Sequence, residues 1–209
     1  MKRMKLRAAF TVIEMLVVVA VLGILLGLVV PAVVAARENG RIAGCQSNLR
    51  QRGQAMALYM SDYDGIYPFG LDPYEWQSGH EDGGHKKGPK YRDRFLAMAD
   101  LRDLLLPYGA SLELWRCPSD RPGAGESVST YVAAGTSYWY GYWLPALGAG
   151  EGFFPDPAGN IVMGEYGAHR GTNLFDWMKN ELFADYHVKL MPYVTEWERD
   201  YAERYVQGN

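Results

Sequence analysis

The sequence predicts an α+β protein in which a long N-terminal α-helix, first transmembrane and then amphipathic, packs on a globular head with an antiparallel sheet. Two observations predict this class: an apolar run near the start of the chain, and short segments rich in Tyr, Trp and Val farther along. The chain has 209 residues, a formal net charge of −3 and 48% hydrophobic residues, which excludes a disordered chain. The charge balance also argues against nucleic acid as a partner.

The apolar run predicts a membrane-spanning helix. Between Phe10 and Ala36 the only formal charge is Glu14, and a helix of that length measures about 40 Å, enough to cross a bilayer. Residues 1–9 hold four basic side chains and no acid, so the positive-inside rule keeps this end in the cytoplasm. The alternative is a cleaved signal peptide, whose apolar stretch is usually shorter.

Glu14 and Pro31 are unusual residues for such a span. An unpaired carboxylate in a membrane segment costs on the order of 2.5–3.5 kcal/mol, so Glu14 predicts a partner from another molecule. Pro31 lacks an N–H and predicts a bend or local melting of the helix, which a bilayer tolerates where neighbouring helices cover the freed groups.

Residues 8–34 resemble the N-terminal segment of type IV prepilins and of type II secretion pseudopilins. The resemblance rests on the basic leader, on Phe10-Thr11-Val12-Ile13-Glu14 and on Pro31. It implies cleavage between Ala9 and Phe10 by a prepilin peptidase and N-methylation of Phe10 by the same peptidase/methyltransferase. It also implies that Glu14 pairs with the Phe10 amine of a neighbouring subunit. Ala9 stands where the family most often has glycine.

The helix is predicted to continue beyond the membrane, from about Phe10 to Asp62, and to end at Asp64-Gly65. An apolar stripe at helical spacing is expected to face the head, with five polar residues on other faces. The stripe is Ile42, Cys45, Leu49, Met56, Tyr59 and Tyr63; the polar residues are Arg37, Arg41, Asn48, Arg50 and Arg52. The predicted parts are a leader (1–9), a transmembrane half (10–36), an amphipathic half (37–63) and an extracytoplasmic head (64–209). The resemblance implies a lollipop shape for the whole.

Three later segments resemble a bacterial family of pseudopilin-like proteins associated with prepilin processing and known by a His–nine–Asp-Gly pattern. The first comprises residues 45–51, 55–59, 62–65 and 67–68, and the other two are 101–120 and 180–192. Two departures stand out. Tyr186 replaces the glycine of the closing hairpin, and His169 lies more than nine residues before Asp185.

Within the head, period and composition predict short helices and strands. Residues 91–108 predict a helix, and 130–134 with 137–143 predict a hairpin around Gly135. Further strands are predicted at 161–165, 181–184 and 187–190. Trp197, Tyr201 and Tyr205 predict a C-terminal helix, and residues 69–90 a surface loop.

Candidate chemistry is sparse. His80, Glu81, Asp82 and His85 are metal-ligand types, but we interpret them as a solvated loop. Asp62 and Asp64 offer oxygens to calcium, although a helix-ending turn is the favoured interpretation. Glu165 and His169 could form an acid/base pair, but we interpret them as partners in a surface hydrogen bond. We therefore predict no catalytic residue, no metal and no cofactor, and no enzyme.

Cys45 and Cys117 are predicted to form a disulfide, because both follow the membrane segment and lie on its oxidising side. The alternative is two separate buried thiols.

The favoured function is a structural subunit that assembles through its N-terminal helix into a type IV pilus or a type II secretion pseudopilus. It is expected in the inner membrane as a single-pass protein with its N-terminus cytoplasmic, and at the surface or in the periplasm once assembled. Its partners are expected to be other pilin-like subunits, the processing peptidase, the inner-membrane assembly machinery and lipid. A membrane-anchored binding module is the alternative, with a ligand face formed by Tyr138, Trp139, Tyr140, Tyr142 and Trp143; a membrane-tethered hydrolase is a third hypothesis.

Overall fold

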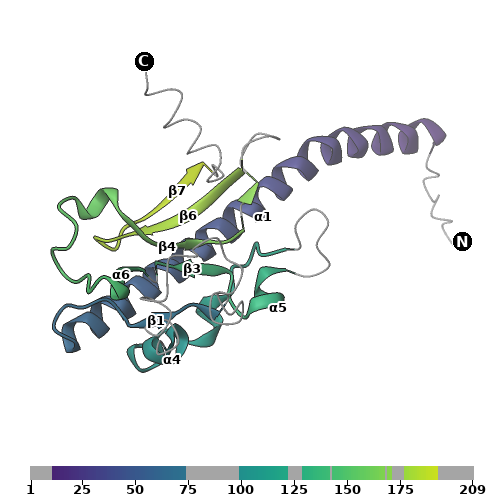
Figure 1. The fold of residues 1–209 in the computed structure, drawn as a ribbon. Coiled ribbons are helices and arrows are strands. Elements are labelled where there is room, and N and C mark those ends of the chain that lie inside the picture. Colours follow the sequence, from purple (N-terminus) through teal and green to yellow (C-terminus); the bar gives the residue numbers. More distant parts are fainter. Residues whose placement is uncertain are drawn as a thin grey trace, which may run out of the picture. The chain divides into compact units, whose positions relative to one another are not determined.

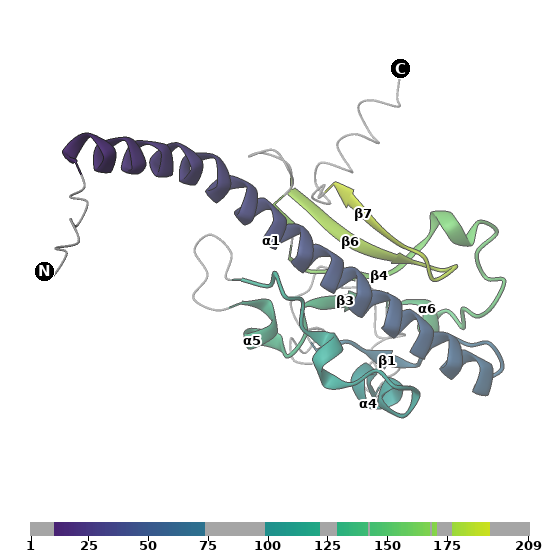
Figure 2. The ribbon, with the colours of Figure 1, turned by 180° about the vertical axis from the view of Figure 1, so that it is seen from behind.

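The α+β class is confirmed in a computed structural model of the chain: a long N-terminal α-helix precedes a head with an antiparallel sheet (Figures 1 and 2). The structure describes residues 11–73, 99–121, 129–141, 143–167, 169–170 and 177–192. The chain divides into two compact units, residues 1–39 and 40–209, and each is described by itself.

Helix α1 spans Val12–Asp62 without interruption, so the local melting predicted at Pro31 does not occur. One proline removes a single backbone N–H from a ladder that its neighbours continue. The helix ends as predicted: Asp64 and Gly65 both have left-handed backbone angles (φ 51° and 73°), and Gly65 N donates to Met60 O at 2.7 Å.

The apolar stripe on α1 is confirmed over most of its length and corrected at two positions. Tyr63 is 52% exposed, and its ring stacks on that of Tyr59 with 4.2 Å between the ring centroids. Arg52, which was expected on another face, is completely buried. The buried residues of α1 are Ile42, Cys45, Leu49, Arg52, Gly53, Ala55, Met56, Tyr59 and Met60.

The main sheet is antiparallel, with β6 pairing with three other strands. Its strands are β3 (Tyr138–Tyr140), β4 (Ile161–Glu165), β5 (His169–Arg170), β6 (Trp177–Phe183) and β7 (Val188–Pro192). The predicted strand at 161–165 and the β6–β7 hairpin are confirmed, the hairpin being longer than expected. Tyr186, in the hairpin turn, has φ 67°, a backbone conformation that glycine adopts at lower cost.

Residues 130–134 form helix α5 (Thr130–Ala134), so the hairpin predicted around Gly135 is wrong. The Asp120 carboxylate accepts hydrogen bonds from Thr130 N and Tyr131 N at 3.2 and 2.6 Å, and Gly135 ends the helix with φ 76°. These caps satisfy the ends of a five-residue helix that its own propensity would not hold. Strand β3 consequently pairs with β4 instead.

The helix predicted over 91–108 is also corrected, while residues 91–98 lie outside the described residues. Ala99–Asp100 is strand β2, which pairs in parallel with β1 (Gly70–Leu71) inside the predicted surface loop. Helix α4 (Leu101–Leu105) begins only where the Asp100 side chain accepts from Arg102 N at 2.8 Å, and η1 (Leu106–Tyr108) follows. The short elements that remain are η2 (Leu112–Trp115), α6 (Trp143–Ala146) and η3 (Pro157–Gly159). The predicted C-terminal helix lies outside the described residues.

The core of the head lies between the second half of α1 and one face of the sheet (Figures 1 and 2). Its members come from α1 and from several described segments of the head: Leu49, Met56, Leu101, Trp115, Tyr138, Tyr140, Leu144, Met163 and Leu182 are all almost fully buried. On the sheet's other face Trp139, Gly164 and Glu181 lie side by side on three strands. A Cβ on Gly164 would lie 2.7 Å from Trp139 Nε1 and closer still to the Glu181 carboxylate, so any larger residue here requires these side chains to shift.

Replacing Asp120 with Ala is expected to lower the free energy of unfolding by about 2 kcal/mol, because Thr130 N and Tyr131 N at the start of α5 lose their acceptor and the Ser137 hydroxyl loses an acceptor at 2.8 Å, while the N-cap bond from Val132 N to the Ser129 hydroxyl remains. Urea unfolding of the detergent-solubilised full chain, followed by near-UV circular dichroism, measures this. Asp103→Ala, at an exposed acid on α4, is the control and is expected to change little. Equal stabilities for the two variants would contradict the capping role.

Candidate functional site

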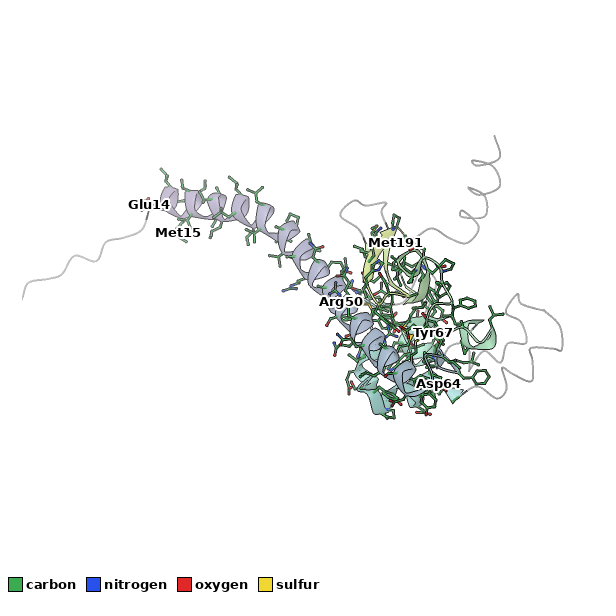
Figure 3. All side chains as sticks on the ribbon, turned by 90° about the vertical axis from the view of Figure 1, so that its left-hand side faces the viewer. Glu14, Met15, Arg50, Asp64, Tyr67 and Met191 are labelled. Carbon is green, nitrogen blue, oxygen red and sulfur yellow. A yellow bond between two sulfur atoms is a disulfide. The ribbon has the colours of Figure 1, made fainter. Side chains whose placement is uncertain are left out.

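The first half of α1 is an apolar surface exposed on all sides (Figure 3). Val12, Ile13 and Leu28 are 81%, 76% and 70% exposed, and no part of the most apolar window is buried. The mean hydropathy of this window is 3.0, and the helix is long enough to cross a membrane once. A helix that is apolar all round has no stable place in water, so this half fits a single-pass membrane anchor.

Glu14, near the start of α1 (Figure 3), has a local partner that the sequence interpretation did not include. Its carboxylate accepts from Thr11 N and from the Thr11 hydroxyl at 2.8 and 2.7 Å, and Thr11 Oγ1 accepts from Glu14 N. This reciprocal pair is a capping box, and the Thr-x-x-Glu spacing is its sequence signature. A carboxylate has about four acceptor sites, so the cap leaves room for a further donor. Ala9 and Phe10 lie outside the described residues.

Cys45 and Cys117 are joined by a disulfide that ties α1 to the head, with Cα atoms 5.0 Å apart. Both are buried, and the Asn48 side-chain amide, one turn along α1, donates to Arg116 O at 2.9 Å. The head is therefore attached to this part of α1 by a covalent bond and a hydrogen bond to the adjoining residue.

Arg52 lies between two aromatic rings in the core. Its guanidinium carbon is 3.7 Å from the ring centroid of Tyr138 and 4.8 Å from that of Trp115. None of its side-chain nitrogens donates a hydrogen bond within the described part of the chain. Burial lowers the pKa of Arg52 to about 10, an effect only partly offset by Tyr138, Glu165 and Asp72. The cation is thus held by ring faces rather than by an ion pair in contact with it.

The sequence contained a signal for Arg52 that its charge obscured. Arg52 follows Cys45 by seven residues and Leu49 by three, which is the spacing of the buried stripe itself. Long-stemmed arginine is compatible with such a position when aromatic faces cover its planar head.

The aromatic ligand face predicted for a binding module is not formed by the described residues. Tyr138 and Tyr140 are buried in the core, and only Trp139 between them points to the other face of the sheet. Alternation along a strand sends successive side chains to opposite faces. Nothing is described of the side chains of Tyr142 and Trp143.

The other candidate sites have different outcomes. Residues 80–85 lie outside the described residues. Asp62 accepts from the Tyr108 hydroxyl at 2.9 Å. Glu165 is buried and accepts from Asn180 N at 2.6 Å, so it is no surface residue, and His169 is described only in its backbone. Within the described residues, the ligand types close enough to share a metal ion are Cys45, Cys117 and Glu165, and the disulfide consumes both thiols.

Comparison with known proteins identifies the first part of the chain. Residues 4–30 match the family described as the prokaryotic N-terminal methylation motif, a type IV pilin-like motif that supports the prepilin-type resemblance of this segment. No curated protein and no solved structure matches the chain. The resemblance of the later segments to the processing-associated family therefore stays a prediction.

Replacing Arg52 with Met is expected to leave the head at least as stable at pH 7. A pKa lowered from 12.5 to about 10 corresponds to about 3 kcal/mol of burial cost, and an apolar side chain of similar volume avoids it. Below pH 10 Arg52 is charged in both the folded and the unfolded chain, so the full cost of burying the charge applies. This cost falls as the pH rises toward 12.5, so the difference in the free energy of unfolding between the two proteins should narrow above pH 10. Urea unfolding at pH 7 and pH 10.5 measures both effects. If Arg52→Met lowers the free energy of unfolding at pH 7 by more than about 1 kcal/mol, the contacts of Arg52 with the rings contribute more than its burial costs.

Proposed function

We propose that this protein is a structural subunit that assembles through the first half of α1 into a type IV pilus or a secretion pseudopilus. One observation carries the proposal: the methylation motif at residues 4–30 coincides with the helix surface that is apolar and exposed on all sides. Lipid covers such a surface before assembly, and the same surface on other copies covers it afterwards. The protein has no catalytic role in this proposal.

The proposed topology follows from the charges around the span. Four cations in residues 1–9 precede it, so the N-terminus lies in the cytoplasm and the head lies beyond the inner membrane. A head on the oxidising side is compatible with the Cys45–Cys117 disulfide. The assembled subunit is then located in the periplasm or at the cell surface.

Glu14 has the central role in the proposed assembly. After cleavage between Ala9 and Phe10, the new N-terminal amine of one copy pairs with Glu14 of its neighbour. Two charges within hydrocarbon attract strongly once they meet, because little dielectric screening remains. The capping box with Thr11 orients the carboxylate while it waits for that partner.

The mature chain is expected to begin at N-methylated Phe10, because a basic leader and Ala9 precede the Phe-Thr-Val-Ile-Glu sequence. N-terminal sequencing and intact-mass analysis of protein extracted from membranes measure this. A chain that retains Met1, or that starts after Pro31, would contradict the proposal.

Replacing Glu14 with Ala is expected to leave a stable, membrane-inserted protein that enters filaments at least tenfold less often. The substitution removes the charge that guides docking while it also lowers the cost of inserting the monomer. Quantitative immunoblotting of sheared filaments against the membrane fraction measures the assembled share.

Thr11→Val is the matched control, because it breaks the side-chain part of the capping box and keeps the carboxylate. Assembly close to that of the unaltered protein is expected for Thr11→Val. If both variants lose assembly equally, helix capping rather than charge pairing explains the effect. If Glu14→Ala assembles normally, the pairing does not drive assembly.

A further inference from the structure

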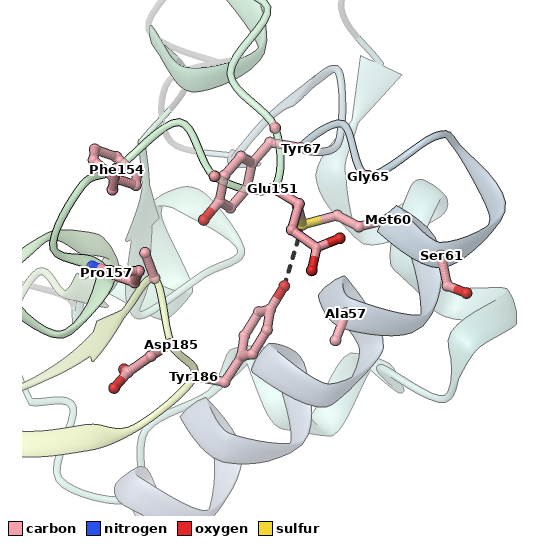
Figure 4. A pocket seen from close by; sticks show the side chains of 13 residues that line it. Ala57, Met60, Ser61, Gly65, Tyr67, Glu151, Phe154, Pro157, Asp185 and Tyr186 are labelled. Atoms are coloured by element: carbon pink, nitrogen blue, oxygen red, sulfur yellow. Dashed lines mark hydrogen bonds between the residues drawn. The ribbon is translucent and has the colours of Figure 1, made fainter.

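A groove at the end of α1 is lined by two carboxylates, those of Glu151 and Asp185 (Figure 4). It has a volume of about 640 Å³ and lies between the last turns of α1, residues 150–157 and the β6–β7 turn. Glu151 and Asp185 line it, and no Lys, Arg or His is found among the described residues that do so. Asp185 accepts from His187 N at 3.2 Å, whereas Glu151 is exposed and has no ion pair within the described part of the chain. The groove thus offers an unneutralised carboxylate.

The rest of the lining suits a flat cation with apolar faces. Tyr67, Phe154 and Tyr186 supply rings, and the Tyr186 hydroxyl donates to Met60 Sδ at 3.3 Å (Figure 4). Tyr67 is only 3% exposed and Tyr186 is partly buried against the core, so these side chains are held in place. A guanidinium can lie on such a surface and donate to a carboxylate at its edge, which an ammonium does less well.

Arg50 is an exposed cation of matching chemistry on the same helix (Figure 3). It has no ion pair within the described residues, and its exposed neighbours Ser47, Gln51 and Gln54 are uncharged. Gln51 is engaged with Ser47, to whose carbonyl and hydroxyl it donates at 3.3 and 3.2 Å. One copy therefore holds an acid in a groove and an arginine on a helix face, each without a counter-charge among the described residues.

We propose that the groove of one copy binds Arg50 of a second copy, with Glu151 accepting from its guanidinium. This inference rests on the proposed assembly. In that assembly copies of the chain lie beside one another, and the opposite charges of Glu151 and Arg50 favour a contact between them.

The test is charge exchange in the full chain, in cells that assemble it. Glu151→Arg and Arg50→Glu are each expected to lower the assembled share about fivefold by placing like charges together. The double variant restores the opposite pair and is expected to recover assembly to within about twofold. Asp103→Arg makes the same charge change on an exposed acid of α4 and is the matched control.

A direct contact is tested by co-expressing one copy with Glu151→Cys and another with Arg50→Cys. A short bis-maleimide is expected to join them into a mixed dimer, which peptide mass spectrometry identifies. Normal assembly of both single charge variants without a mixed dimer overturns the inference and leaves the proposed function standing. Cross-linking of Glu151→Cys to another part of the chain or to a different protein, with no rescue in the double variant, also overturns it. Failure of the unaltered chain to assemble at all is instead a failure of the proposed function.

Discussion

The packing of the second half of α1 against the sheet is the constraint on which the head depends. Leu49 and Met56 of the helix meet Leu182 of β6 and Tyr138 of β3 in one buried cluster. Without α1, the sheet would expose this face to water, and burial of such apolar area is the main source of folding free energy. The second half of α1 thus completes the core of the head, whereas the first half of the same helix exposes apolar side chains.

Polar and covalent contacts then fix where along the helix the head sits. The disulfide joins Cys45 to Cys117, the Asn48 amide meets Arg116 O, and the Arg52 guanidinium lies on Tyr138 and Trp115. Apolar packing alone tolerates small shifts, but a shift of one residue rotates the helix by about 100° and removes all three contacts. Burying the Arg52 charge costs free energy, but its contact with the two rings forms only when α1 has the correct register against the head.

At the start of α1, the Glu14 carboxylate is hydrogen-bonded within its own chain and still has acceptor sites for another donor. Thr11 caps Glu14 within one copy, so the carboxylate is ordered before any neighbour arrives. Preorganised groups lose less freedom on binding, which would favour docking of a second copy at this point. In the assembly that we propose, the exposed apolar surface supplies the contact area and the carboxylate sets the register.

The sequence by itself determined the elements whose signals are long and local. The span of α1, the β6–β7 hairpin and the methylation motif all follow from residues close together in the chain. Only the tertiary structure decided that residues 130–134 form a helix, because Asp120 caps it from ten residues away. The same holds for the burial of Arg52, which requires rings from two other segments, and for the groove, which three segments form. Helical and strand periods depend on neighbours in sequence, whereas caps, ring contacts and cavities depend on residues that only folding brings together.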